Sequence, residues 1–341
     1  RERVLNRIEL AVIGTGGWGV TLAIHVAARG VPVALVARTD EEAERLRVNG
    51  YSPRLPAVRF PTTLEATANA AEAVGQARVI LLVVPSQTMR QNVRSLRHAL
   101  RPDSLLVSAS KGIEIASTLR MSEVIGQELS IDDRRIGVLS GPNLAQEVAA
   151  RKPSSSVVAC SEIALASEVQ ALLVAPHFRV YTHTDVVGVE LGGALKNIVA
   201  LGAGMCDGLE AGDNGKAALM TRGLAEMARL GKAAGAEPLT FSGLAGLGDL
   251  IATCMSPLSR NRTLGERLAR GQTLAEIQGE MHQVAEGVTT TKAARELAKT
   301  YGVEMPITDL MYRVLFEGMA PAEAGQALMM RDPKHELEGI L

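Results

Sequence analysis

The feature that most constrains this chain is a glycine pattern close to its amino terminus. Gly14, Gly16 and Gly19 follow the apolar segment 8–13 and precede a helical segment, 20–29. This is the order of a strand, a tight turn and a helix. In such a unit the first glycine makes the turn, the second lets the backbone approach a pyrophosphate, and the third lets helix and strand pack closely. The pattern predicts a parallel α/β domain that binds a dinucleotide at the positive end of the helix dipole.

The first half of the chain alternates short β-branched segments with helical ones, which is typical of a parallel sheet with crossover helices. The expected strands are 9–13, 32–37, 78–84, 104–109, 136–139, 155–159 and 179–182. After about residue 188 only helical patterns follow, at 190–205, 215–234, 246–253, 263–270, 273–278, 289–301, 307–316 and 321–328. We therefore expect a Rossmann-type α/β domain over residues 1–188 and an all-α domain over residues 189–341.

Composition and charge narrow the class of protein. The chain has 341 residues, 47% of them hydrophobic and 21% charged, and its 36 basic and 37 acidic residues give a net charge of −1. This profile is that of a soluble globular protein, and its charge balance offers no broad basic surface for nucleic acid or an anionic membrane. No segment fits a signal peptide, and we expect no stable membrane insertion. Cys160, Cys206 and Cys254 form no CxxC pattern, so we expect a cytoplasmic protein without a metal site or disulfide framework.

The residue that follows the second expected strand bears on cofactor choice. In this fold an acidic side chain about twenty residues after the glycines binds the ribose hydroxyls of NAD, whereas an arginine accommodates the 2′-phosphate of NADP. Arg38 occupies this position, and Asp40 follows close behind. The sequence favours NADP(H), and Asp40 leaves NAD(H) open.

Lys196 stands out because the segment 191–205 around it is otherwise apolar or glycine, except for Asn197. A helix that is apolar all round is buried, so this lysine has no polar face to occupy. A buried ammonium needs a carboxylate partner or gives up its proton more readily, and Glu190 and Asp249 are the candidate partners. With a lowered pKa, Lys196 could act as an acid or base near neutral pH; the alternative is a structural lysine on a solvated face.

Three polar clusters adjoin the expected elements. Two of them, 110–112 and 140–143, follow strands at the carboxyl edge, where open α/β sheets bind ligands. The third, 257–263, holds Arg260 and Arg262 ahead of a helix expected over 264–270. Free N–H groups together with two arginines favour an anion there. Taken alone, each cluster could equally be a turn with capping residues.

A series of spaced motifs runs in order along the chain, at 14–22, 84–87, 110–114, 139–147, 193–197, 212–214, 243–249, 259–261, 284–287 and 305–307. Such a series is far more specific than a glycine pattern alone. In these motifs the chain resembles the bacterial NAD(P)-dependent glycerol-3-phosphate dehydrogenase family over essentially its whole length. The resemblance implies a helical second domain like the C-terminal domain of 6-phosphogluconate dehydrogenase, and it favours a homodimer.

The resemblance also implies an activity, the reversible reduction of dihydroxyacetone phosphate to sn-glycerol 3-phosphate, the head-group precursor of phospholipids. By the family pattern Lys196 exchanges a proton with the C2 oxygen of the substrate, and Lys111 and Asp249 lie beside it. The residues implied in substrate binding are Lys111, Gly141, Asn143, Lys196, Asp249, Ser259, Arg260 and Asn261. Those implied in cofactor binding are Gly14, Gly16, Gly17, Trp18, Gly19, Arg38, Lys111, Ala145, Arg260, Val284 and Glu286.

Three positions depart from the usual family pattern. Gly17 and Asn143 stand where a small hydroxyl residue is commoner, and Gly215 stands where threonine is frequent. Gly17 still offers its backbone N–H, and Asn143 keeps a hydrogen-bonding side chain. At Gly215 a hydroxyl that could contact the substrate or cap a helix is lost.

Two other functions share some of these features. A dehydrogenase of the same architecture that acts on a β-hydroxyacid or ketopantoate would bind a carboxylate, which the segment 259–262 alone does not distinguish from a phosphate. A non-enzymatic NADP sensor would keep the glycine pattern and lose catalysis. Lys111, Lys196 and Asp249 together, with the glycine run before Asp249, favour the glycerol-3-phosphate interpretation.

Overall fold

The computed structural model describes residues 8–281, 285–333, 335 and 336, and these form two compact units. Unit 1 takes its residues from Arg1–Ser110, Met121–Leu139 and Asn143–Val186. Unit 2 takes its residues from Lys111–Arg120, Ser140–Pro142 and Val187–Leu341. Two short segments of the first half of the chain therefore belong to the second unit.

Unit 1 is built on one sheet of eight strands in the order β3-β2-β1-β4-β5-β6-β7-β8. The strands are β1 (Leu10–Ile13), β2 (Val33–Val36), β3 (Leu64–Thr67), β4 (Val79–Leu82), β5 (Leu105–Ser108), β6 (Ile136–Ser140), β7 (Ser154–Cys160) and β8 (Phe178–His183). β1 pairs in parallel with both β2 and β4, so it lies inside the sheet. Leu10, Leu35 and Leu81 are fully buried because helices cover both faces. The expected Rossmann-type fold is confirmed.

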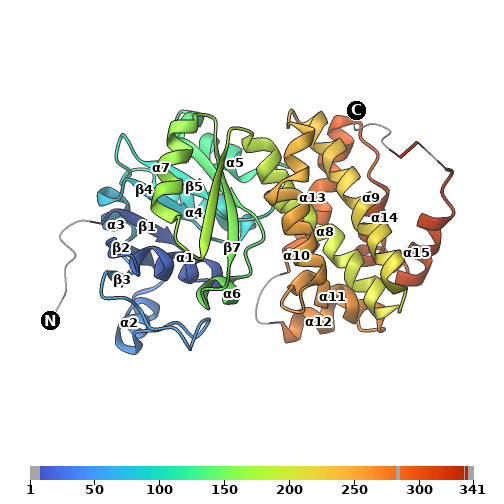
Figure 1. Cartoon of the computed structure of the whole chain (residues 1–341), viewed down its shortest axis with the longest axis horizontal. Helices are drawn as coiled ribbons and strands as arrows, with labels where there is room; N and C mark the ends of the chain where they lie inside the picture. The colour runs from blue at the N-terminus through green and yellow to red at the C-terminus, as the bar shows by residue number, and fades with distance from the viewer. Residues whose placement is uncertain (1–7, 282–284, 334, 337–341) are drawn as a thin grey trace. The chain divides into compact units, whose positions relative to one another are not determined.

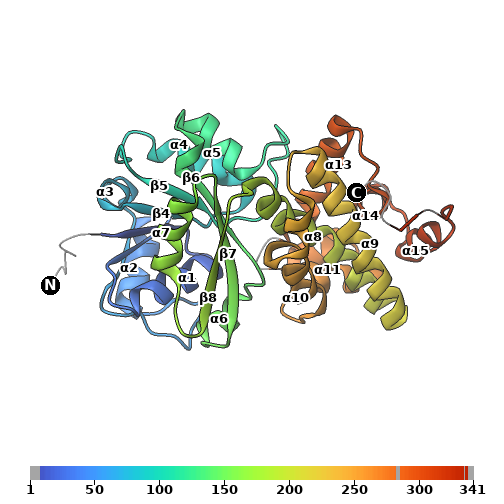
Figure 2. The ribbon, with the colours of Figure 1, turned by 45° about the horizontal axis from the view of Figure 1, so that its top comes forward.

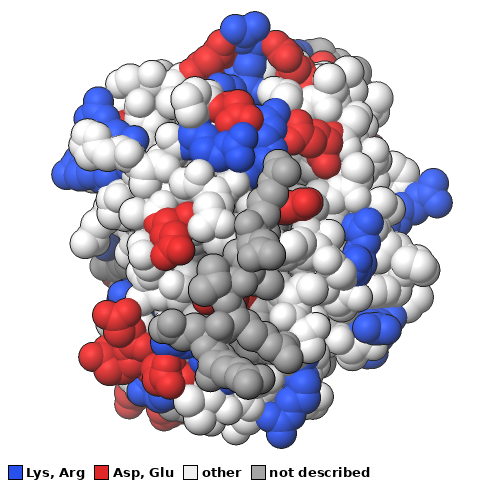
Figure 3. All heavy atoms as spheres, turned by 90° about the vertical axis from the view of Figure 1, so that its left-hand side faces the viewer, with Lys and Arg blue, Asp and Glu red and all other residues white. Residues whose placement is uncertain are grey.

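Helices flank this sheet on both sides. They are α1 (Gly17–Ala27), α2 (Asp40–Asn49), α3 (Ala70–Gln76), α4 (Met89–Leu96), α5 (Met121–Leu129), α6 (Ala145–Ala149) and α7 (Ile163–Leu173). In Figures 1 and 2, α1 and α7 lie on one face of the sheet, and α4 and α5 lie on the other. The face of unit 1 in Figure 3 carries basic and acidic side chains interspersed among uncharged ones.

Two local expectations for unit 1 were wrong. Strand β3 was not expected, because its sequence Leu-Glu-Ala-Thr has no run of β-branched residues; it occupies the sheet edge, where only Ala66 is fully covered. Helix α1 begins at Gly17 rather than at residue 20, which places the third glycine of the pattern inside its first turn. Glycine is a poor helix former, so propensity alone delays the expected start of the helix.

Unit 2 is helical, as expected. Its helices are α8 (Val186–Gly208), α9 (Gly212–Ala233), α10 (Asp249–Met255), α11 (Arg260–Ala269), α12 (Leu274–Glu280), α13 (Glu286–Tyr301), α14 (Pro306–Phe316) and α15 (Pro321–Met329). A short 3-10 turn, Pro238–Ser242, and the π-helical turn η4 (Leu244–Gly248) lead into α10. Expected and observed helix limits differ by up to a turn at some ends.

Helix α8 forms the core of unit 2. Its length and the mean hydropathy of 1.4 over an 18-residue stretch would fit a membrane span, yet 89% of that stretch is buried inside the protein. Packing by neighbouring helices therefore accounts for its apolar composition. The approach is closest against α11, where a side-chain carbon at Gly204 would lie 1.9 Å from the carbonyl oxygen of Arg262 and one at Gly265 would lie 1.9 Å from that of Leu201. The two helices thus cross with backbone against backbone, which fixes Arg260 and its neighbours relative to α8.

Candidate functional site

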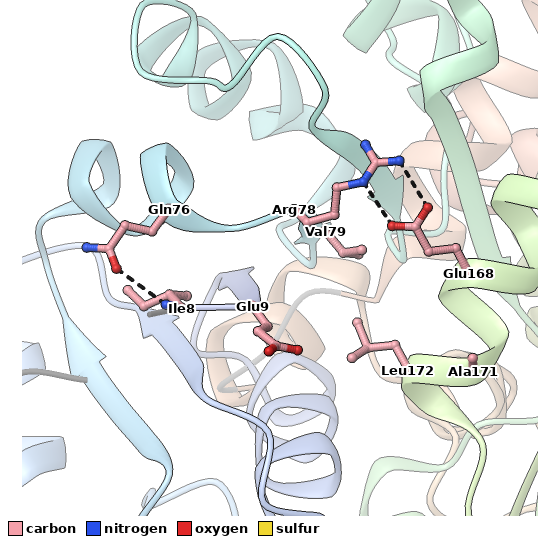
Figure 4. Close-up of a pocket in the computed structure, with 8 residues that line it drawn as sticks. All are labelled: Ile8, Glu9, Gln76, Arg78, Val79, Glu168, Ala171 and Leu172. Carbon is pink, nitrogen blue, oxygen red and sulfur yellow. Dashed lines mark hydrogen bonds and ion pairs between the residues drawn. The ribbon is translucent and has the colours of Figure 1, made fainter. Parts of the chain in front are cut away.

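A hollow of about 410 Å³ lies at the amino-terminal ends of β1 and β4 (Figure 4). Its lining residues are Ile8, Glu9, Gln76, Arg78, Val79, Glu168, Ala171 and Leu172. The charged pair in it is internally satisfied, with Arg78 Nε 2.9 Å from Glu168 Oε1. Ligands of open α/β sheets bind at the opposite, carboxyl ends of the strands. The cofactor site is therefore expected at the carboxyl ends of the strands.

The glycine loop follows β1 at this carboxyl edge. Gly14 has φ 116°, a conformation that side chains rarely adopt, and a side-chain carbon at Gly19 would lie 2.1 Å from the carbonyl oxygen of Gly14. A side-chain carbon at Gly16 would meet nothing within 4 Å. Helix α1 begins here with no side-chain cap and no acidic residue in its first turn. Its free N–H groups and the open space at Gly16 fit the pyrophosphate of a dinucleotide.

Three of the other expected cofactor residues lie beside this loop. Thr21 Oγ1 donates to the carbonyl oxygens of Gly17, at 2.8 Å, and Ala145, at 3.2 Å, so α6 is tied to the first turn of α1. Trp18 packs edge-on against Phe178, with ring centroids 6.4 Å apart. The Trp18 Nε1–H is buried without a hydrogen-bond partner among the described residues. Unit 1 therefore brings together Gly17, Trp18 and Ala145.

Arg38 is exposed just beyond β2, and a carboxylate that was not expected from sequence lies beside it. Glu42, in the first turn of α2, accepts from Thr15 Oγ1 at 2.6 Å and from the Arg38 backbone N–H at 3.1 Å. It thereby joins the glycine loop to the residue that follows β2. Asp40, the carboxylate considered from sequence, is the exposed first residue of α2. The closeness of Glu42 to Arg38 in the sequence was the signal available.

In unit 2, Lys196 and Asp249 form a buried ion pair, and Lys111 forms a second ion pair with the same Asp249. Lys196 Nζ donates to Asp249 Oδ1 at 2.9 Å and to Thr253 Oγ1 at 2.5 Å. Lys111 Nζ donates to the other carboxylate oxygen of Asp249 at 2.5 Å and to the carbonyl oxygen of Gly141 at 3.0 Å. The side chains of Lys196 and Asp249 are only 8% and 3% exposed, and that of Lys111 is 18% exposed. One carboxylate thus divides its two oxygens between two ammonium groups.

Burial and charge shift the titration of this cluster in opposite directions. Burial, with the like charge of Lys111, lowers the pKa of Lys196 to about 8 against the opposing attraction of Asp249. Burial alone would raise the pKa of Asp249, but the ammonium groups of Lys111 and Lys196 outweigh it and hold that pKa below its usual value. Burial raises the pKa of Cys254, which follows Thr253 on α10, to about 12, so its thiol stays neutral. The arrangement is a carboxylate fixed as an anion beside a lysine that can exchange a proton near neutral pH.

The local fold explains how Asp249 arrives there. It begins α10 directly after the π-helical turn η4, a rare element that is frequent at functional sites. Thr253 lies one turn further on the same helix, and its hydroxyl also contacts Asp249 Oδ1, at 3.2 Å. Thr253 was missed from sequence, although its helical spacing from Asp249 was visible. Of the two candidate partners for Lys196, the structure supports Asp249; Glu190 instead pairs with Arg120.

The segment expected to bind an anion begins α11. Ser259 is the N-cap of the helix and accepts from the Arg262 N–H at 3.2 Å, so the helix begins earlier than expected. Arg260 is exposed at its first position, whereas Arg262 pairs with Asp207, at 2.6 Å. Of the two arginines in this segment, Arg262 is therefore engaged in an ion pair, and Arg260 is the exposed one.

Asn261 connects three helices of unit 2. Its amide nitrogen donates to Asn197 Oδ1 at 2.9 Å, and its oxygen accepts from the Gly287 N–H at 2.9 Å. Asn197 follows Lys196 on α8, and Gly287 follows Glu286, the half-buried first residue of α13. This network fixes Lys196, Arg260 and Glu286 relative to one another within unit 2.

The remaining expected residues lie outside these clusters. Asn143 belongs to unit 1, where its amide nitrogen donates to Ser156 Oγ at 2.8 Å and its buried Oδ1 has no partner among the described residues. Gly215 lies in the first turn of α9. Val284 lies outside the described residues. Within the described ranges, no group of three or more His, Cys, Asp or Glu side chains is placed to hold a metal ion.

Residues 9–166 match the family model described as the N-terminus of NAD-dependent glycerol-3-phosphate dehydrogenase, and residues 185–326 match the model of its C-terminus. The chain belongs to this family. It is 50% identical over 327 residues to glycerol-3-phosphate dehydrogenase [NAD(P)+] of Frankia casuarinae, covering 96% of this chain and 97% of that protein. It is 48% identical to the Thermobifida fusca enzyme of the same name, covering 97% of this chain and 99% of that protein.

Solved structures agree with this membership. Glycerol-3-phosphate dehydrogenase from Coxiella burnetii superposes with a TM-score of 0.91 at 35% identity, covering 95% of this chain and 99% of that one. A ketopantoate reductase from Ralstonia eutropha superposes with a TM-score of 0.60 at 14% identity, covering 94% of this chain and all of that one. That likeness is one of fold alone. The family members are NAD(P)-dependent oxidoreductases.

Proposed function

We propose that this chain catalyses the reversible reduction of dihydroxyacetone phosphate to sn-glycerol 3-phosphate with NAD(P)H and so supplies glycerol 3-phosphate for phospholipid synthesis. The observation that carries the proposal is the buried Lys196–Asp249–Lys111 cluster in a chain 50% identical to an enzyme named for this substrate. A buried carboxylate between two ammonium groups is costly to build for structure alone, and it is suited to a reaction that moves a proton.

In this proposal Lys196 is the proton donor and acceptor for the C2 oxygen. Asp249 and Thr253 take two of its ammonium hydrogens, and an ammonium has three. The third is available to the substrate oxygen. Lys111 is the second ammonium group, stabilising the negative charge that develops on that oxygen. When bound, the nicotinamide supplies the hydride.

The phosphate of the substrate is assigned to the start of α11. Arg260 contributes the positive charge, and Ser259 and Asn261 flank it on the first turn. The dipole of the helix adds to the attraction for a dianion. Gly141 and Asn143 complete the substrate contacts in this proposal.

The dinucleotide is assigned to the glycine loop of unit 1, and the preferred cofactor to NADP(H). The proposed contacts are Gly14, Gly16, Gly17, Trp18, Gly19, Arg38 and Ala145, together with Lys111, Arg260, Val284 and Glu286. Arg38 supports a 2′-phosphate because its guanidinium is exposed beyond β2. The adjacent Glu42 carboxylate opposes it, so NAD(H) remains the competing cofactor.

Three further assignments rest on the family and on sequence. We assign residues 1–188 to a cofactor domain and residues 189–341 to a substrate domain, with Lys111–Arg120 and Ser140–Pro142 grouped with the latter. A homodimer is the proposed assembly. A cytoplasmic location is proposed on the basis of the three free cysteines.

The rival to exclude is a dehydrogenase for a carboxylate substrate, because a ketopantoate reductase shares the fold. The test follows oxidation of NADPH and of NADH, in parallel, with dihydroxyacetone phosphate, dihydroxyacetone or ketopantoate. We expect turnover with dihydroxyacetone phosphate and little with the other two, since neither carries the dianion that Arg260 and the α11 amino terminus would bind. Comparable rates with dihydroxyacetone would contradict the assigned phosphate site, and faster turnover of ketopantoate would favour the rival.

A further inference from the structure

We propose that Arg120 and Glu190 form a positioning pair that holds the Lys111 loop against α8, so that Lys111 and Lys196 meet the same Asp249 carboxylate. The loop is the segment Lys111–Arg120, one of the two segments that belong to unit 2 although they lie in the first half of the chain. The inference rests on the function proposed above for Lys111, and it names two residues to which that function gives no role.

The Lys111 loop is a closed structure rather than a loose connection. Residues Ile113 and Arg120 form an antiparallel bridge, and the Glu114 N–H donates to the carbonyl oxygen of Leu119 at 2.9 Å. Ser117 Oγ donates to Glu114 Oε2 at 2.6 Å inside the turn. Because its two ends are joined in this way, a displacement at Arg120 is transmitted to Lys111.

Three anchors fix this loop to unit 2. At its beginning, the ammonium of Lys111 contacts Asp249 and the carbonyl oxygen of Gly141. Two residues further on, Ile113 is fully buried in the hydrophobic core around α8. At its end, Arg120 Nη1 donates to Glu190 Oε2 at 2.9 Å.

Glu190 ties the third anchor to the helix that carries Lys196. It lies on α8, upstream of Lys196, and its side chain is 4% exposed against 15% for Arg120. Between the two, Gly193 leaves room for Ser140, because a side-chain carbon there would be 2.4 Å from Ser140 Oγ, and it would be in ordinary contact, at 3.7 Å, with Lys111 Cγ. Helix α8 thus carries both the carboxylate that holds the end of the loop and, further along, Lys196.

The energetics of buried charge favour a positional role. Removing two charges from water costs about as much as their attraction returns, so a buried ion pair is weak evidence for stability. What such a pair does supply is direction, since an arginine fork binds a carboxylate in a restricted geometry. Two lysines can share Asp249 only if the loop and α8 keep their register, and a displacement of about 1 Å at such a site can cost about 100-fold in rate.

The test compares Arg120→Gln, Glu190→Gln and the double variant with the unaltered protein in dihydroxyacetone phosphate reduction. We expect each single variant to lower kcat about 10- to 100-fold, and the double variant to be no worse than the poorer single one, because the pair acts as a unit. The alkaline limb of the pH profile of kcat, where kcat falls as Lys196 loses its proton, should move to higher pH. In these variants the Lys111 ammonium would move away from Lys196, so its like charge would no longer lower the pKa of Lys196. The attraction of Asp249 would then act on Lys196 alone, while Thr253 and Cys254 stay in place. Any loss of NADPH affinity should be no larger than that of Lys111→Met, because Lys111 is itself among the proposed cofactor contacts.

Two controls separate position from stability and from the proposed function itself. Glu226 is an equally buried carboxylate on α9 that accepts from the Ile307 N–H at 2.6 Å, so Glu226→Gln disturbs the unit away from the lysines and should leave kcat and the pH limb as they are. Lys111→Met tests the proposed function alone. If it keeps a near-normal kcat, the role of Lys111 is wrong whatever the Arg120 variants do.

The remaining outcomes decide the inference. If Lys111→Met is impaired while Arg120→Gln and Glu190→Gln keep their kcat and pH limb, even with lower melting temperatures, the positioning role is wrong. Arg120→Lys keeps a charge on the pair and should recover part of the kcat lost in Arg120→Gln; no recovery would overturn the role of the ion pair. If the glutamine variants do not fold, Arg120→Lys carries the same test, with a lowered kcat and raised pH limb expected and wild-type values contradicting.

Discussion

The two units build their proposed sites by opposite means. Unit 1 does so largely by leaving side chains out, since Gly14 and Gly19 let the chain pack closely at the start of α1 and Gly16 leaves open space beside it. Unit 2 does so by burying charged side chains, with Lys196 and Asp249 almost entirely removed from solvent. The first kind of site is damaged by adding a methyl group, and the second by removing a charge. The contrast yields predictions of separable effects on cofactor affinity, turnover and stability.

The largest effect is expected from removing the proposed proton donor. Lys196→Ala should lower kcat by about 10²–10⁴, the usual contribution of a general acid or base. NADPH binding, measured by fluorescence titration, should be kept because the glycine loop is untouched. A near-normal kcat would reduce Lys196 to a structural lysine and remove the contrast between the two units.

A smaller effect, on cofactor affinity, is expected from two glycine substitutions that differ in their surroundings. Gly16 has φ −62° and open space, so Gly16→Ala should leave the melting temperature unchanged and weaken NADPH binding about 10-fold or more, as the methyl group meets the pyrophosphate. Gly19→Ala forces a carbon to 2.1 Å from the Gly14 carbonyl oxygen, so it should lower both affinity and melting temperature. Wild-type binding by Gly16→Ala would move the pyrophosphate away from Gly16.

The pH dependence of turnover should reveal the lowered pKa of Lys196, about 8. Reduction needs the protonated lysine, so its kcat should fall about tenfold per unit as pH rises above that pKa. Oxidation of glycerol 3-phosphate needs the neutral lysine, so its kcat should rise through the same range. Measured with saturating substrates in both directions, two limbs of the same sign would contradict a single proton-transferring group.

The smallest effect is expected at the ribose end of the cofactor. Arg38→Ala should lower the preference for NADPH over NADH about tenfold, because one charge-assisted contact to the 2′-phosphate is lost. Glu42→Gln should shift the preference a few-fold the other way, since it removes a neighbouring negative charge. Dissociation constants for both cofactors give the ratio, and an Arg38→Ala ratio equal to that of the unaltered protein would remove the case for NADP(H).

Long apolar segments and local motifs were predictable from sequence, whereas contacts between residues distant in sequence were not. Strand β4 is an unbroken apolar run and helix α8 is mostly apolar, and burial on all sides leaves few alternatives for them. Strand β3 has four mixed residues and depends on its pairing with β2, a contact distant in sequence. The local sequence pattern therefore did not predict that a strand would pair with β2 at that edge of the sheet.

The same distinction holds at the candidate site. Lys196 could be singled out because its own helix offers no polar face, but the choice between Glu190 and Asp249 as its partner depended on how α10 packs. Thr253 and Glu42 were overlooked because threonine and glutamate on helices are ordinary residues until a distant atom contacts them. Asn261 was expected to hold substrate, and its amide proves to be engaged with Asn197 and Gly287.

The assignment of Lys111–Arg120 and Ser140–Pro142 to unit 2 has a consequence for how this chain can be divided. A fragment that begins at Val186 would keep α8 and α10 but lose the ammonium of Lys111, the carbonyl of Gly141 and the guanidinium of Arg120. Asp249 would then have one cation instead of two, and Glu190 would be a buried carboxylate without Arg120. The helical half is therefore not an exchangeable module, and recombination between relatives would have to carry these two short segments along with it to keep a working centre.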